Sequence, residues 1–136
     1  KLVFGNHVHC LFAEPNHAPA MLIDLYTDKH DEVCVQDFGI DNIIDADGLA
    51  VGRPSGFVGK RLKSIIDGVF TVFDATMYRQ LALMADHKNI FMEPSALAGL
   101  PGIMDVMHEI QDTPKRLNYI LGVDEISYSQ YAFWLD

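Results

Sequence analysis

The stretch HVHCLFAEP at residues 7–15 determines the fold predicted here, together with its shorter counterpart IFMEP at residues 90–94. Each stretch places an apolar run before a Glu-Pro pair, and a sequence that favours a helix follows each pair. A short apolar run that ends at a turn signal before a helix is typical of a strand in a parallel sheet. Ligands of open α/β sheets bind at the carboxyl ends of the strands. We therefore expect Glu14 and Glu93 to lie at that edge.

The rest of the chain continues this alternation. Residues 7–13 predict the first strand, and apolar positions at helical spacing predict a helix over residues 18–28. Residues 37–52 contain too much Ile, Leu and Val for an exposed loop, so we expect a short helix and strand around a turn at Asp47-Gly48. The other helices are expected over 55–67, 74–87 and 94–111, the last interrupted at 100–102. The other strands are expected over 32–36, 69–73, 90–92 and 118–122.

The composition is that of a folded protein and excludes several function classes. Of the 136 residues, 49% are hydrophobic and 21% charged, a balance that rules out a disordered tail. Ten basic and 19 acidic residues give a net charge of −9, which disfavours binding to nucleic acid or to an anionic membrane through a basic face. Cys10 and Cys34 are expected to be buried free thiols, and they indicate a cytoplasmic protein. The chain lacks an initiator Met and ends on apolar residues, so we expect residues 1–136 to be one segment of a longer polypeptide.

The polar residues near the two Glu-Pro pairs leave several roles open. Glu14 and Glu93 can bind a cation, position a ligand or relay protons, or they can cap the helices that follow. His7 and His9 would share a strand face, but no third ligand completes a zinc site, so core or surface roles are favoured. His17 is better placed to approach a ligand.

The other candidate motifs predict no complete site. An EF-hand centred on Gly48 would put Ile43 and Pro54 at ligand positions, so that loop is rejected. Residues 52–56 precede a helix and give a weak anion-binding signal. Ser95 lies in no nucleophile motif, and the lysines lie on polar helix faces. From the residues alone, the chain is an α/β segment with a candidate ligand edge and no complete catalytic set.

Four strings in this order resemble bacterial D-serine dehydratases, which are pyridoxal-phosphate enzymes of fold type II, the tryptophan-synthase-β type. They are HVHCLFAEP (7–15), VQDFGIDN (35–42), ADGLAVGRPSGFVG (46–59) and EPSALAG (93–99). The resemblance runs from Lys1 to about Gly102. It implies β-elimination of water from D-serine to give pyruvate and ammonia, with pyridoxal 5'-phosphate as the electron sink. It also implies an α/β fold with a three-layer αβα arrangement, of which this segment would form part of the larger cofactor-binding domain.

The resemblance also assigns roles to particular residues. The Schiff-base lysine, the phosphate loop and the group that bonds the pyridine nitrogen would all lie outside the segment, so no catalytic residue is expected within it. Glu14, Ala18, Leu49 and Val51 match positions that bind a cation in related enzymes, Ala18 through its carbonyl oxygen. An acid found in related racemases is Ala20 here, which favours a monovalent ion such as potassium. Glu93 and Ser95 match a motif that packs near the cofactor.

Two alternatives to this assignment remain. The resemblance implies a monomeric parent that acts on D-serine, but a related dehydratase of threonine or another hydroxy amino acid would look similar. A non-catalytic acidic α/β module that binds a cation or a partner protein is the alternative from a different class.

Overall fold

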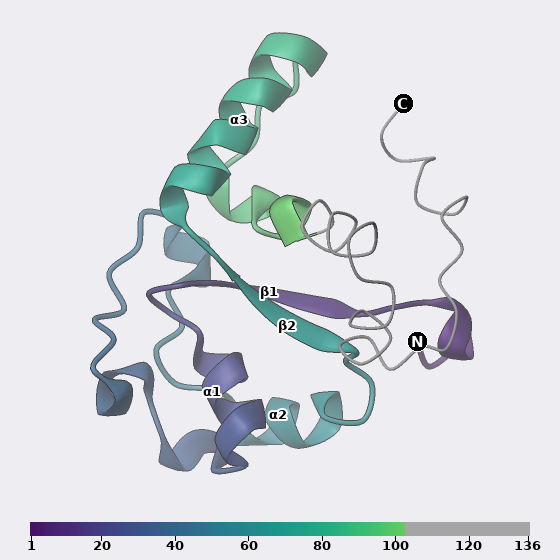
Figure 1. The fold of residues 1–136 in the computed structure, drawn as a ribbon, viewed down its shortest axis with the longest axis vertical. Helices are drawn as coiled ribbons and strands as arrows, with labels where there is room; N and C mark the ends of the chain where they lie inside the picture. The colour runs from purple at the N-terminus through teal and green to yellow at the C-terminus, as the bar shows by residue number, and fades with distance from the viewer. Residues whose placement is uncertain (103–136) are drawn as a thin grey trace, which may run out of the picture.

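The computed structural model describes residues 1–102 and contains a parallel two-stranded sheet flanked by helices (Figure 1). Strands β1 (Leu11–Pro15) and β2 (Gly68–Val72) pair in register, from Leu11 opposite Gly68 to Pro15 opposite Val72. The α-helices are α1 (Ala20–Thr27), α2 (Gly56–Leu62) and α3 (Asp74–Lys88). Short 3₁₀ helices complete the described part: η1 (Gly5–His7), η2 (His30–Glu32), η3 (Val35–Phe38), η4 (Asp47–Leu49) and η5 (Pro94–Leu97). Among residues 1–102, no helix is long and apolar enough to span a membrane.

The helices lie on both sides of the sheet, with α1 and α2 on one side and α3 and η5 on the other (Figure 1). Because side chains alternate along a strand, Ala13 and Val72 face α3 and pack in a cluster with the fully buried Met77. Glu14 points to the opposite face, toward α1. A second cluster, between α1 and the 3₁₀ segment that follows it, contains Ala20, Ile23, Val33 and Val35. The predicted α/β class is thus confirmed.

The elements expected in three segments are wrong. The expected strand over 32–36 is replaced by η2 and η3, because its buried residues Val33 and Val35 pack on α1 rather than beside another strand. Residues 37–52 form neither an α-helix nor a strand; they contain the end of η3 and the single turn η4. Residues 90–92 are not a strand and are exposed, Phe91 to 79% of its surface.

Other predicted boundaries are shifted or fall outside the description. The first strand begins at Leu11, because η1 and an extended connection occupy residues 5–10. Helix α2 ends at Leu62, five residues early, where the amides of Ile65 and Ile66 both bond the Leu62 carbonyl in a turn. The elements expected over 103–111 and 118–122 lie outside the described residues. Cys10 and Cys34 are free as expected, but half-buried rather than buried.

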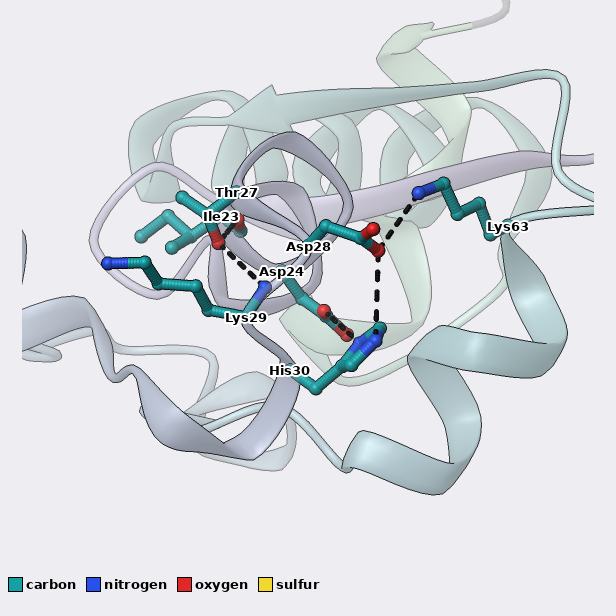
Figure 2. A network of polar contacts seen from close by, with 7 residues as sticks. All are labelled: Ile23, Asp24, Thr27, Asp28, Lys29, His30 and Lys63. Carbon is teal, nitrogen blue, oxygen red and sulfur yellow. Dashed lines mark hydrogen bonds and ion pairs between the residues drawn. The ribbon is translucent and has the colours of Figure 1, made fainter.

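A polar network joins the end of α1 to α2 (Figure 2). Asp24 is completely buried, and its Oδ1 lies 2.8 Å from His30 Nδ1. Lys63 Nζ lies 2.9 Å from Asp28 Oδ1, and this hydrogen bond with the lysine charge holds the pKa of Asp28 below its usual value. Gly59 of α2 packs directly on Asp24, since a Cβ at residue 59 would lie 1.7 Å from Asp24 Oδ2. The two helices therefore meet over a buried carboxylate.

Candidate functional site

Glu14 lies at the carboxyl end of β1 and is only 6% exposed. Its Oε1 accepts the Met21 amide at 2.7 Å, and its Oε2 accepts the Leu22 amide at 2.8 Å. These amides lie in the first turn of α1, where helix N–H groups lack internal partners, and Pro19 before the helix provides no side-chain cap. Glu14 therefore caps α1, one of the roles that its sequence context left open.

The surroundings of Glu14 are mostly apolar. Burial raises the pKa of Glu14 above its ordinary value of 4.5; the bonds from Met21 and Leu22 oppose this, and the negative charge of Asp24 adds to it. A pocket of about 190 Å³ lies beside the carboxylate. Its walls are Phe12, Ala13, Glu14, Pro15, Ala20, Met21, Leu49, Val51, Pro54, Ser55 and Val58.

The pocket brings together three of the four residues to which the resemblance assigns cation binding. Glu14 comes from β1, whereas Leu49 and Val51 come from the segment at and after η4. Ala18 is buried in the turn after β1, where its amide bonds the Pro15 carbonyl, and it does not line the pocket. The Leu49 carbonyl accepts the Val51 amide at 2.7 Å.

Within the described residues, no group of three or more His, Cys, Asp and Glu side chains could hold a metal ion. A cation here would thus depend on Glu14 and on backbone carbonyls. Carbonyl and carboxylate oxygens that already accept one hydrogen bond keep a second acceptor site, so this donor set is compatible with a monovalent ion. The potassium site stays a prediction.

The second Glu-Pro motif opens η5. Ser95 Oγ donates to Glu93 Oε1 at 2.5 Å, and Pro94 occupies the start of the helix, where its missing N–H is not needed. A Cβ at Gly48 of η4 would lie 3.3 Å from Ser95 Oγ, so η4 packs closely on this motif. Residues 48–51 therefore lie beside both groups of candidate residues. Gly48 packs on Ser95, which was expected near a cofactor, and Leu49 and Val51 line the pocket with Glu14, which was expected near a cation.

The histidines with predicted site roles do not form one cluster. His7 is exposed in η1, and His9 Nδ1 lies 3.9 Å from Asp67 Oδ2. His17 Nδ1 lies 2.7 Å from Asp41 Oδ1, joining the turn after β1 to the loop after η3. The weak anion signal before α2 also finds little support, because Asp31 already faces that turn: a Cβ at Gly56 would lie 2.4 Å from its Oδ1.

Sequence reasoning missed Asp24, the most deeply buried charged residue of the described part. A signal was present in the pattern of the helix. Asp24 lies next to Ile23 and four residues after Ala20, so it falls on the stripe that α1 turns toward the core. An acid at a core-facing helix position indicates a specific polar partner, here His30.

Comparison with known proteins identifies close relatives over most of the chain. Over 107 residues the chain is 59% identical to a "Probable D-serine dehydratase" of Pseudomonas putida strain GB-1, covering 79% of this chain and 24% of that protein. Over 102 residues it is 61% identical to a protein of the same name in Geobacillus kaustophilus, covering 75% of the chain and 23% of the relative. It is 59% identical over 102 residues to a "D-serine dehydratase" of Yersinia enterocolitica, with the same coverage.

The match covers a limited part of these proteins. No family model matches the chain. The chain spans about a quarter of the length of the curated relatives it matches. The resemblance indicated by the four sequence strings is confirmed within that quarter. There the chain is closely similar in sequence to proteins named D-serine dehydratase.

Proposed function

We propose that this chain is part of a D-serine dehydratase, whose complete form removes water from D-serine to give pyruvate and ammonia. The observation that carries the proposal is 55–61% identity to proteins of that name over three quarters or more of the chain. Such identity over a contiguous stretch supports a common fold and a common site within that stretch.

The proposed cofactor is pyridoxal 5'-phosphate, bound in a fold type II enzyme with a three-layer αβα domain. A parallel strand pair with helices on both sides supports that architecture. When bound, the cofactor supplies an electron sink for the electron pair released at the substrate. The contribution of this chain would be structural: Glu93 and Ser95 hold η5 against η4, beside the pocket. In keeping with the resemblance, we expect the Schiff-base lysine outside this segment, in another part of the complete protein.

A monovalent cation, potassium, is the proposed second ligand. The convergence of Glu14, Leu49 and Val51 on one pocket supports it, and Ala18 would contribute a backbone carbonyl. The direct test is the activity of the complete protein with potassium, sodium or a large organic cation as the only monovalent ion. Equal rates in all three salts would argue against a specific site.

The complete protein is proposed to be a cytoplasmic monomer with D-serine as its substrate. The net charge of −9 supports the absence of nucleic-acid and membrane partners. Two alternatives are kept. One is a dehydratase of a related hydroxy amino acid with the same fold, and the other is a non-catalytic acidic module that binds a cation or partner.

The deciding experiment measures the complete protein for bound cofactor and for pyruvate release. We expect a visible absorption band from the cofactor, and pyruvate from D-serine in preference to L-serine and D-threonine. Preference for D-threonine would support the related dehydratase. A protein with neither band nor product would favour the binding module.

A further inference from the structure

We infer that Asp24 is a positioning residue, whose buried carboxylate sets the spacing between α1 and α2 and thereby the width of the pocket beside Glu14. The inference rests on the proposed function, because it gives that pocket a part in the activity of the complete protein. Asp24 is fully buried and does not line the pocket itself, so it would act through the two helices.

The contact between Asp24 and Gly59 fixes how closely the two helices approach. Asp24 Oδ1 is held by His30, whose nitrogen points to it from the segment after α1 (Figure 2). Asp24 Oδ2 is buried and has no hydrogen-bond partner among the described residues. It lies against Gly59, where a Cβ would come within 1.7 Å of it. Oδ2 therefore acts as a spacer that only a glycine on α2 can accommodate.

The same two helices both contribute to the lining of the pocket. Met21 of α1 and Val58 of α2 both line it. Asp24 lies one helical turn after Met21, and Gly59 directly follows Val58. Because a short helix moves nearly as a rigid body, a change of spacing at the Asp24–Gly59 contact displaces Met21 relative to Val58.

Stability alone is a poor reason for a carboxylate at this place. Burying a carboxylate with one unpartnered oxygen lowers the stability of the folded protein. An apolar residue of similar volume would often stabilise the contact between α1 and α2 better. The N-terminal end of α1 is held by Glu14, through the Met21 and Leu22 amides. Asp24 and Glu14 together thus fix both the position and the rotation of α1 beside the pocket.

The test uses the complete protein with ¹³C-methyl-labelled methionine, so that the Met21 methyl resonance reports on the pocket wall without any need for activity. Asp24→Leu replaces the carboxylate with a larger apolar side chain that cannot bond His30, whereas Asp24→Asn keeps the shape and an acceptor for His30. Asp28→Asn is the matched control, since Asp28 belongs to the same network but is exposed. We expect Asp24→Leu to shift the Met21 resonance and to lower kcat/KM for D-serine by roughly 10- to 100-fold, because small misplacements of a site have effects of this size.

The two conservative variants should leave the resonance in place and kcat/KM within about twofold of the wild type. An unmoved Met21 resonance in a folded Asp24→Leu protein would overturn the inference, as would a kcat/KM equal to that of Asp28→Asn in an active enzyme. If Asp24→Leu does not fold, Gly59→Ala perturbs the same contact from α2 and must shift the same resonance. Absence of pyruvate from the wild type would instead refute the proposed function, and the Met21 resonance would still test the positioning role.

Discussion

Replacing Glu14 by glutamine should weaken α1 by removing a cap that reaches the helix from a different element. In the wild type each carboxylate oxygen accepts one amide, Met21 at 2.7 Å and Leu22 at 2.8 Å. Glutamine keeps one acceptor oxygen and turns an NH₂ group toward the other amide. One donor in the first turn is then left without a partner, and the helix dipole loses the negative charge at its N-terminus.

The expected size of the effect follows from these two bonds. A helix cap contributes about 0.5–2 kcal/mol, and a hydrogen bond to a charged group about 1.5–3 kcal/mol. Glutamine recovers part of this loss because it does not bury a charge. We expect Glu14→Gln to lower the free energy of unfolding by about 1–2 kcal/mol at neutral pH. Urea unfolding of the complete protein, followed by circular dichroism, measures the change.

The matched control is Glu93→Gln in the second Glu-Pro motif. Glu93 is exposed and its carboxylate accepts from Ser95, so this variant should change stability by less than about 0.5 kcal/mol. Equal unfolding free energies for Glu14→Gln and Glu93→Gln would refute the reasoning, because the two motifs differ chiefly in burial and in the amides that only Glu14 bonds.

The pH dependence gives a second check on Glu14. Burial raises its pKa above 4.5, so the folded protein holds this proton more tightly than the unfolded chain does. The contribution of Glu14 to stability is then complete below pH 4.5 and declines as the pH rises through the folded-state value. Protonated Glu14 still offers an oxygen to each amide and buries no charge, so the stability difference between wild type and Glu14→Gln should be largest below pH 4.5 and should shrink to the value of about 1–2 kcal/mol expected at neutral pH. A difference that grows with pH would contradict this assignment.

Three further variants test the packing and the charges. Gly59→Ala places a Cβ 1.7 Å from a buried carboxylate oxygen and should cost about 2–4 kcal/mol in urea unfolding, whereas Gly99→Ala, with open space around it, should change stability by less than about 0.5 kcal/mol. Met77→Ala removes a fully buried side chain and should cost about 2–5 kcal/mol, measured by thermal unfolding; a loss below that of Gly99→Ala would contradict the assigned core. Burial raises the pKa of Asp67, but the hydrogen bond and charge of Lys1 help to outweigh it and hold the pKa below 3.8. Asp67→Asn should therefore be less stable than the wild type by about 1 kcal/mol at neutral pH, and this deficit should disappear as the pH falls below 3.8; a deficit independent of pH would exclude the ion pair.

Local sequence predicted the regular elements best where apolar periodicity and turn signals agreed. Strand β2 was expected over 69–73 and lies at Gly68–Val72, and α3 was expected over 74–87 and lies at Asp74–Lys88. Asp74 is the first residue of α3, and its Oδ2 accepts the Asp45 amide from a distant loop. The local sequence pattern predicts where a helix begins and ends, but the hydrogen-bond partner of its first polar side chain depends on the tertiary fold.

The expected strand at 32–36 failed for a different reason. Val33 and Val35 are buried, as in a strand, yet they pack on α1: Val33 lies in the extended link after η2, and Val35 is the first residue of η3. A buried alternating pair is compatible with both structures, and only a neighbouring strand makes it a sheet. In the described residues, the Val35 amide bonds the Gly52 carbonyl, and no strand lies beside it.

The sequence by itself determined the α/β class, the placement of a Glu-Pro pair at the carboxyl end of β1, and the likeness to D-serine dehydratases, because composition, periodicity and matching strings are properties of neighbouring residues. Tertiary structure alone decided that Glu14 caps α1 through amides seven and eight residues away, and that Asp24 meets Gly59, 35 positions later. Hydrogen bonds and close contacts act over a few ångströms in space, so their partners are fixed only when the parallel strands and the helices between them have packed.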